Sequence, residues 1–344
     1  MRSPYQDLPR TAYWRTGVAE QHPLKPADIY RKKFAILPTD SIATAGSCFA
    51  QHISRHLRSG GYDVLDLEPP PAGLSGKTAQ DFGYLTYTCR YGNIYTSRQL
   101  LQLAQEAYGK RSPGKGIVWE RGGRFFDALR PGVEPEGFAT RREVLRHRKP
   151  HLKYVREMFD TCKVFIFTFG LTETWEDMKT GTVFPTAPGT IAGEYDPARI
   201  RFRNLTYPEV LDDFLAFRDL VKAQNPDVRF LVTVSPVPLT ATASGHHVLP
   251  ATVYSKSVLR AVAGHLSDTL DDVDYFPSYE IIAAHPSRGF FFEGNLRSVS
   301  PEGVEVVMKA FGAQHKPVKA AAVAGKVKSR NDVVCEEALL EAFS

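Results

Sequence analysis

The chain has 344 residues, with 43 Lys and Arg against 38 Asp and Glu, and 43% of the residues are hydrophobic. This composition is typical of a soluble globular protein with a sizeable core, and it excludes a disordered or fibrous chain. No uncharged apolar run approaches the ~20 residues of a transmembrane helix, and the start of the chain lacks the apolar stretch of a secretory signal. The four cysteines show neither CxxC pairs nor metal-ligand spacing, which predicts a reduced, cytoplasmic protein without disulfides or bound metal.

Positive charge is concentrated in two parts of the chain. Lys110–Arg156 holds thirteen Lys or Arg and five Asp or Glu, and Val306–Asn331 holds six basic residues and no acid. Such segments are either solvated faces and tails or docking sites for an anionic partner. No RNA-binding signature accompanies them, so nucleic acid is not an expected partner. Residues 316–344 are expected to form a basic tail that ends in a short docking helix within Cys335–Phe343.

Strand and helix patterns alternate along the chain. Continuous apolar runs indicate buried strands, and apolar residues at helical spacing indicate amphipathic helices. In chain order these are the strand Ser41–Ala45, the helix Cys48–Arg58, the strand Tyr62–Leu67, the helix Ser97–Tyr108 capped by Ser97, the helix Thr140–Asp160 interrupted near Pro150, the strand Lys163–Phe169, the helix Tyr207–Gln224, the strand Val228–Val234, the helix Thr252–Leu270, the strand Val273–Phe276 and the helix Pro301–Phe311.

This order predicts an α/β fold, a three-layer αβα sandwich around a mainly parallel, flavodoxin-like sheet of five strands. Residues 1–315 are expected to form a single domain. Within it, a basic insertion is expected at about residues 68–150, with a small hairpin around Gly122 and Gly123. Open α/β sheets bind their ligands at the carboxyl ends of the strands, and most of the motifs below follow a predicted strand.

The turn after the first strand carries two nucleophiles side by side, Ser47 and Cys48. Gly46 permits a sharp turn, and the start of the following helix offers free N–H groups and the positive end of the helix dipole. Such a position lowers the pKa of a thiol and can receive an oxyanion. The alternative is that Ser47 only caps the helix and Cys48 is a small buried hydrophobe.

Several motifs carry a resemblance to a known family. Gly46–Ala50 reads GSCFA, and over about Thr11–Phe311 the chain resembles the GSCFA family, which is similar to the SGNH (GDSL-like) hydrolases. The further motifs are RYGNIYT at Arg90–Thr96, FGLTETW at Phe169–Trp175, TAPGTIAG at Thr186–Gly193, SPVPLTAT at Ser235–Thr242, YSKSVLRA at Tyr254–Ala261 and NLRSVSPEGV at Asn295–Val304.

The resemblance implies a nucleophile at Cys48, with Ser47 as the alternative, and oxyanion donors at Gly92, Asn93 and Thr172. Thr172 stands where the superfamily has an Asn donor, so the resemblance implies an altered oxyanion hole.

The last motif departs most from the superfamily. Asn295 and Ser298 stand where the catalytic Asp and His are expected, and a neutral serine cannot act as a base. His247, in the loop after the strand Val228–Val234, is the preferred replacement, ahead of His246 and His285.

Five further residues are expected to contact the substrate. Glu173 can orient a hydroxyl, an aromatic ring can stack on a sugar, and basic side chains suit an anionic group. Ser255 and Lys256 could alternatively form a Ser–Lys pair. The full set is Glu173, Trp175, Arg90, Lys256 and Arg297.

The resemblance implies an enzyme without a cofactor, an acyl-ester hydrolase or acyltransferase. Its expected substrate is a short acyl group, such as acetyl, on a carbohydrate or a polysaccharide precursor. The alternative is a non-hydrolytic protein that binds a carbohydrate or nucleotide sugar on the same scaffold, because the catalytic Asp and His are replaced by Asn295 and Ser298.

Overall fold

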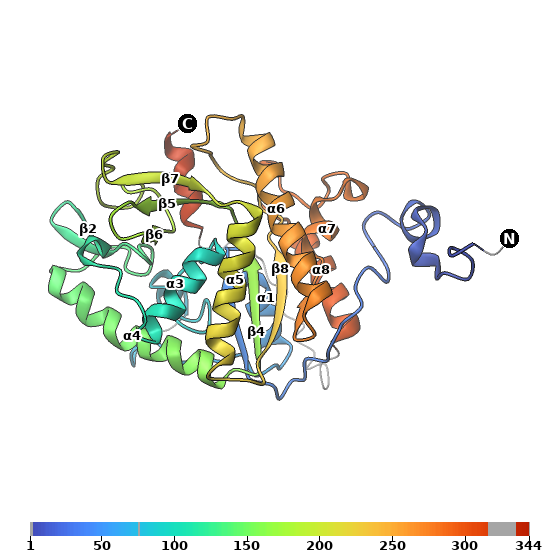
Figure 1. Ribbon diagram of the computed structural model, residues 1–344, viewed down its shortest axis with the longest axis horizontal. Helices are drawn as coiled ribbons and strands as arrows, with labels where there is room; N and C mark the ends of the chain where they lie inside the picture. Colours follow the sequence, from blue (N-terminus) through green and yellow to red (C-terminus); the bar gives the residue numbers. More distant parts are fainter. Residues whose placement is uncertain (1–2, 75, 316–334, 344) are drawn as a thin grey trace.

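A parallel sheet of four strands forms the centre of the computed structural model, which describes residues 3–74, 76–315 and 335–343 (Figure 1). Each neighbouring pair of strands is parallel, so all four end at the same edge of the sheet. In spatial order they are β1 (Ile42–Gly46), β4 (Val164–Phe169), β8 (Arg229–Val234) and β9 (Val273–Tyr275).

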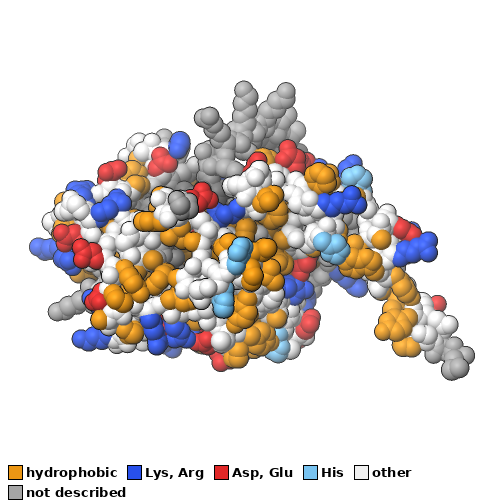
Figure 2. All heavy atoms as spheres, turned by 90° about the horizontal axis from the view of Figure 1, so that it is seen from above, with side chains coloured by type: hydrophobic (Ala, Val, Ile, Leu, Met, Phe, Trp, Pro, Cys, Tyr) orange, Lys and Arg blue, Asp and Glu red, His pale blue; other side chains and the backbone are white. Residues whose placement is uncertain are grey.

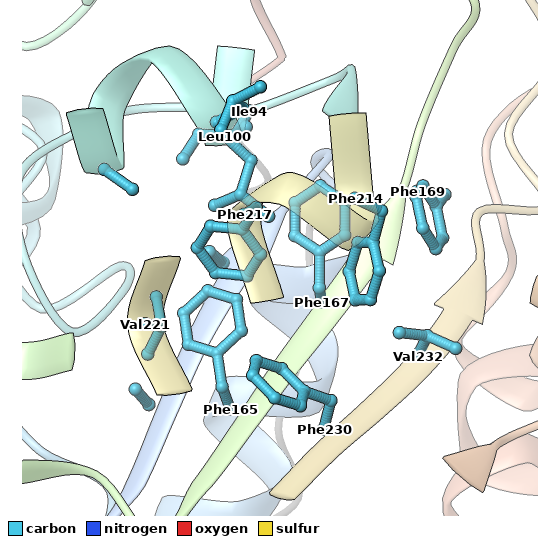
Figure 3. Close-up of a cluster of buried hydrophobic side chains, with 14 of the residues drawn as sticks. Ile94, Leu100, Phe165, Phe167, Phe169, Phe214, Phe217, Val221, Phe230 and Val232 are labelled. Carbon is cyan, nitrogen blue, oxygen red and sulfur yellow. The ribbon is translucent and has the colours of Figure 1, made fainter. Parts of the chain in front are cut away.

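Helices cover both faces of this sheet. Side chains alternate between the faces along a strand, so Phe165 and Phe167 join one buried cluster while Val164 and Ile166 join the other. Figure 3 shows the first cluster, in which phenylalanine rings of β4 and α5 interlock. The first face packs on α3 (Ser97–Ala107), α4 (Arg141–Thr161), α5 (Tyr207–Lys222) and α6 (Val248–Thr269); the second packs on α1 (Ala50–Ser59), α7 (Ser278–Ala283) and α8 (Pro301–Gln314).

The expected α/β fold is thereby confirmed, with four strands rather than five. The segment Tyr62–Leu67 forms a single bridge, between Val64 and Ile42, instead of a strand. Its N–H at Leu65 still donates to Ile42, but Leu67 already donates to Thr88, so the chain turns away from β1 after one pairing.

Two helices differ in detail from the expectation. The prediction of an interruption at Pro150 was wrong: α4 runs through it, because its buried face, from Val144 to Phe159, packs against the core and outweighs the hydrogen bond that proline removes. The helix α3 is capped by Thr96 and not by Ser97, in a capping box with Gln99.

A second sheet lies beside the first, above its carboxyl edge in Figure 1. The predicted hairpin is present as β2 (Val118–Arg121) and β3 (Arg124–Asp127). It packs on an antiparallel sheet that the sequence analysis did not predict, because its central strand, ETWED, has the composition of a loop. In that sheet the buried carboxylates of Glu176 and Asp177 accept hydrogen bonds from arginines. Arg201 and Arg203 donate to Glu176, and Arg199 donates to Asp177. The sheet consists of β6 (Val183–Phe184), β5 (Glu173–Asp177) and β7 (Ile200–Asn204).

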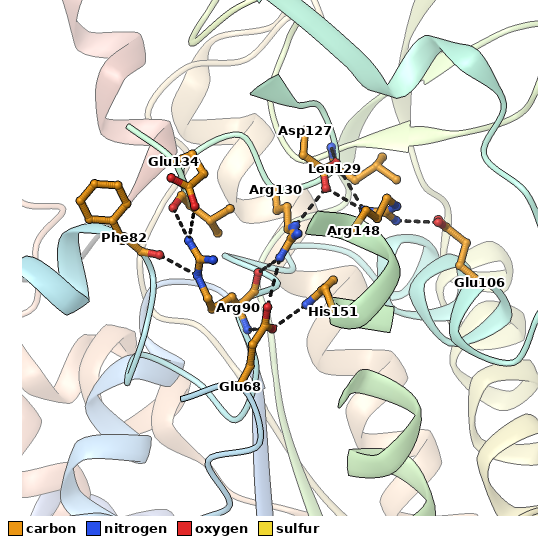
Figure 4. Close-up of polar contacts among 11 residues, drawn as sticks. Glu68, Phe82, Arg90, Glu106, Asp127, Leu129, Arg130, Glu134, Arg148 and His151 are labelled. Atoms are coloured by element: carbon orange, nitrogen blue, oxygen red, sulfur yellow. Dashed lines mark hydrogen bonds and ion pairs between the residues drawn. The ribbon is translucent and has the colours of Figure 1, made fainter. Parts of the chain in front are cut away.

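Three arginines between residues 68 and 150 form ion pairs inside the protein, namely Arg90, Arg130 and Arg148. Figure 4 shows a chain of buried ion pairs in which arginines of the loop before α4 and of α4 itself meet carboxylates. Since α3 and α4 also pack directly on the sheet, this region is part of the main core. The network consists of Glu68, Arg90, Glu106, Asp127, Arg130, Glu134, Arg148 and His151.

The N-terminal segment extends away from the body, as Figures 1 and 2 both show. Trp14 stacks on His285, with ring centroids 5.4 Å apart. On the face in Figure 2, basic and acidic side chains are interspersed. Among the described residues, no helix has the length and apolarity needed to cross a bilayer. The predicted basic tail falls largely on residues 316–334, which lie outside the described residues.

Candidate active site

The turn between β1 and α1 carries Ser47 and Cys48 at the carboxyl edge of the sheet. Gly46 has a φ of +139°, and a Cβ there would lie 2.5 Å from the carbonyl oxygen of Thr168. Gly170, just after β4, is similarly crowded, because its Cβ would lie 2.9 Å from the Cβ of Ser47. Glycine at both positions therefore lets the two strand ends approach and fixes where the turn points.

Ser47 and Cys48 have different surroundings. The Ser47 hydroxyl is buried without a hydrogen-bond partner among the described residues, and its backbone N–H donates to Thr168 at 3.1 Å. Cys48 is also buried, but its thiol forms a hydrogen bond with the thiol of Cys335. Cys48, rather than Ser47, thus meets other ionisable groups.

Cys335 belongs to the C-terminal segment, Cys335–Phe343, whose helical part is η5 (Glu336–Phe343). The hydrogen bond with Cys335, together with burial, raises the pKa of Cys48 well above its usual range. Conversely, the hydrogen bond from Cys48 and the nearby Arg297 guanidinium lower the pKa of Cys335 to about 5. Arg297 Nη2 lies 3.8 Å from the Cys335 sulfur, so Cys335 is the member of the pair that carries the negative charge.

Two cations face this thiol pair. Arg297 lies 3.5 Å from the carboxylate of Glu337, the third residue of the C-terminal segment. Lys256, buried on α6, donates from Nζ to the carbonyl oxygen of Gly170 at 2.7 Å. Burial lowers the pKa of Lys256 to about 8, against the opposing charges of Glu337 and Cys48. Burial also raises the pKa of Glu337 to about 8.

Glu336, the next residue of the C-terminal segment, contacts the RYGNIYT motif. Its Oε2 accepts from Asn93 Nδ2 at 2.5 Å and from the Tyr95 hydroxyl at 3.0 Å. The Asn93 amide is oriented by the body of the protein, because the Tyr87 hydroxyl donates to its Oδ1 at 2.6 Å. Burial raises the pKa of Glu336 to about 7. Asn93 and Tyr95 therefore form a preorganised pair of donors that holds one oxygen atom.

Glycines line the space around the other oxygen of Glu336. A Cβ on Gly92 would lie 3.4 Å from Oε1, and a Cβ on Gly132 would lie 2.9 Å from it. Gly92 also has a φ of +70°, which favours glycine. The predicted oxyanion residues Gly92 and Asn93 thus both contact Glu336, and the residue before it, Cys335, contacts Cys48.

Other predicted site residues are engaged elsewhere. His247 is exposed and caps α6, accepting the Leu249 N–H at Nδ1, 3.1 Å away. The Thr172 hydroxyl donates to Asn204 at 2.6 Å. Among the described residues, the side chains with the largest effects on the pKa of Cys48 are Cys335, Glu337 and Arg297. Glu173 accepts a hydrogen bond from the Thr242 hydroxyl at 2.6 Å. Its negative charge also contributes to the raised pKa of Glu337.

Arg90 and Trp175 lie in the supporting structure. The Arg90 guanidinium is buried and donates to Phe82, Val133 and Glu134. The Trp175 ring packs edge-on against Phe202 of β7 and against Tyr195 in the loop before that strand. His285 is stacked on Trp14, and His246 is exposed.

The arrangement combines a thiol, two cations and two neutral donors around one buried turn. A thiol needs a proton acceptor to become a nucleophile, and Lys256 has the lowered pKa that such a role requires. Within the described parts of the chain, no group of three or more His, Cys, Asp or Glu could hold a metal ion.

A family model for the GSCFA family matches residues 41–311. The chain belongs to the GSCFA family. The match runs from the start of β1 into α8, so it includes Cys48, Asn93, Lys256 and Arg297. Residues 335–343 lie beyond it. A comparison with curated proteins found no match.

Sequence reasoning missed the part that the C-terminal segment plays. It predicted a helix there, and η5 is present, but nothing in the pattern of Cys335, Glu336 and Glu337 indicates which surface they contact. Tyr95 was within reach, since it lies in the same RYGNIYT motif as Asn93 and two residues after it.

Proposed function

We propose that this GSCFA protein is an SGNH-like acyl-ester hydrolase or acyltransferase in which Cys48 attacks a short acyl group, such as acetyl. The substrate is a carbohydrate or polysaccharide precursor in the cytoplasm. The observation that carries the proposal is the position of Cys48 in the β1–α1 turn, where the C-terminal segment that contacts its thiol also contacts Arg297 and the donors Asn93 and Tyr95, and Lys256 is close enough to feel its charge.

Lys256 is the general base of the proposed reaction. With a pKa of about 8, a substantial fraction of its amine is neutral near pH 7.5 and can take the proton of Cys48. The thiolate attacks the acyl carbon, and the carbonyl oxygen moves to Asn93 and Tyr95, where two donors stabilise the oxyanion. The Lys256 ammonium then protonates the leaving alkoxide. Water, or an acceptor hydroxyl, completes the cycle by attacking the thioester.

His247 is a weaker candidate for the base, because it is exposed and its Nδ1 already accepts the Leu249 N–H. Ser47 is a weaker candidate for the nucleophile, because its side chain packs against Gly170 and its buried hydroxyl has no hydrogen-bond partner among the described residues. The Cys48 thiol, in contrast, contacts polar groups.

The test is hydrolysis of p-nitrophenyl acetate and acetylated sugars by variants of the full chain. Cys48→Ala and Lys256→Met are expected to lower kcat/KM by roughly 10²–10⁴-fold. His247→Ala, Ser47→Ala and the core variant Cys162→Ala are expected to retain most of the activity. Mass spectrometry of denatured wild-type protein should show an acetyl group on Cys48. A wild-type rate in Cys48→Ala would overturn the proposal.

A second candidate function, carbohydrate binding without hydrolysis, is favoured by one observation. The Asn295 amide donates a hydrogen bond to the Ser298 hydroxyl at 3.0 Å. The two residues that replace the catalytic Asp and His are therefore neutral and hydrogen-bonded to each other. Saturable binding of an acetylated sugar, with no acetyl transfer to Cys48, would favour this alternative.

A further inference from the structure

The C-terminal segment is anchored by its acidic residues. Glu336 and Glu337 are 4% and 8% exposed, whereas Leu339 and Phe343 in the same helix are 49% and 71% exposed. A helix that packs as part of a core buries its apolar side chains and leaves its charges in water. Here the polarity is reversed, so polar contacts rather than apolar packing hold the segment against the body of the protein.

Each of three consecutive side chains occupies a different part of the candidate site. Cys335 covers the thiol of Cys48, Glu336 occupies the donors Asn93 and Tyr95, and Glu337 faces Arg297. These are the groups that the proposed reaction needs for the nucleophile, the acyl oxygen and the substrate. An acyl substrate and the docked segment cannot bind together.

The segment also changes the chemistry of the nucleophile. When it is docked, the hydrogen bond and the negative charge of Cys335 raise the pKa of Cys48, and Cys335 and Glu337 both lie against Arg297. When it leaves, Lys256 and Arg297 remain as unopposed cations near the thiol, which favours the thiolate of Cys48. Docking therefore both blocks the site and suppresses the thiol.

We propose that Cys335–Phe343 is an internal pseudosubstrate, which occupies a site built to recognise a pair of neighbouring acidic or oxyanionic groups. The identity of the competing acyl ester rests on the proposed function, but the docking itself does not. A ligand that displaces the segment presents an acceptor oxygen to Asn93 and Tyr95 and an anionic group, such as a sugar carboxylate, to Arg297.

Docking can be measured in the full chain without any assay of activity. Diamide removes two electrons and two protons from a neighbouring pair of thiols and is itself reduced to the hydrazine. Peptide mapping after brief treatment should show a Cys48–Cys335 disulfide before any bond that involves Cys89 or Cys162. A disulfide between two chains, or none at Cys48, would overturn the internal assignment.

Alkylation gives a second measurement. The double variant Glu336→Ala/Glu337→Ala should label at Cys48 with iodoacetamide at least tenfold faster than wild type, whereas Leu339→Ala should label at the wild-type rate. A peptide of sequence SEEALLEAF should slow labelling of the double variant, and SAAALLEAF, which lacks both carboxyl groups, should not. Equal rates in all three proteins would contradict the proposal.

The two proposals fail separately. A trapped disulfide and faster labelling, with no ester cleavage by any variant, would retain the pseudosubstrate and remove the acyl chemistry. Ester cleavage at equal rates by wild type and the double variant would do the reverse.

Discussion

His151 donates from Nδ1 to the carboxylate of Glu68 across 2.7 Å, and the contact joins a buried imidazole to a mostly buried carboxylate in the network of Figure 4. Burial and the nearby Arg130 lower the pKa of His151 to about 4, so the imidazole is neutral at pH 7 and the contact is a hydrogen bond to an ion. The contact links Glu68, before α3, to the middle of α4.

The pH dependence of stability follows from this contact. An unfolded histidine binds its proton near pH 6.5, whereas His151 in the folded protein resists protonation down to about pH 4. The free energy of unfolding should therefore fall by roughly 3 kcal/mol as the pH is lowered from 6.5 to 4. Urea unfolding at pH 7, 5.5 and 4 measures it. His151→Gln should flatten this part of the curve, and an unchanged curve in that variant would assign the loss to other groups.

Asp127 is the carboxylate that both buried arginines share. It accepts from Arg130 at 2.9 Å and from Arg148 at 3.0 Å. Asp127→Ala should lower the free energy of unfolding by about 3–5 kcal/mol, because two buried cations lose a partner. The exposed pair of Glu120 and Arg141 provides the control, and Glu120→Ala should change stability by less than about 1 kcal/mol. Similar losses in the two variants, measured by urea unfolding, would contradict the burial argument.

The close approach of Gly46 to Thr168 predicts a large effect of a single methyl group. Gly46→Ala should cost at least about 3 kcal/mol, from a positive φ and a clash with a backbone oxygen. Gly61 also has a positive φ, of +77°, but has no atom within 4 Å of its Cβ position, so Gly61→Ala should cost only about 1 kcal/mol. Equal midpoints in chemical denaturation would show that the crowding has no effect.

Docking of the C-terminal segment should weaken as the pH rises. The pKa of Glu336 is raised to about 7 by burial when the segment is bound, whereas a carboxyl group in water titrates near 4.5. The bound form thus favours the proton, and this contribution is lost as the pH rises through about 7. Between pH 6 and 8.5 the affinity of the peptide SEEALLEAF for the double variant should fall about tenfold more than that of SQEALLEAF. Calorimetry at both pH values measures the difference, and parallel curves for the peptides would refute the assignment.

The sequence predicted the elements whose evidence is local. The continuous apolar run VFIFTF predicts a strand that is buried on both faces of the sheet, as β4 is. Gly46 predicts the sharp turn after β1. The strand ETWED was missed because its buried acids are stabilised by arginines of β7 and of the residue before it, a pairing that only the fold creates. The contact between Cys48 and Cys335 could not be predicted for the same reason, because the two residues are far apart in the sequence and only the fold brings them together.

Gly92 and Gly132 limit the size of the group that can take the place of the Glu336 carboxylate. A carboxylate and an acetyl group have the same outline, a flat carbon with one oxygen and one further atom. With the oxygen on Asn93 and Tyr95, the methyl carbon of an acetyl ester would take the place of Oε1, against Gly92 and Gly132. The space beside Gly92 and Gly132 would then select substrates by acyl length, and it would admit a two-carbon acyl group and exclude butyryl and longer groups.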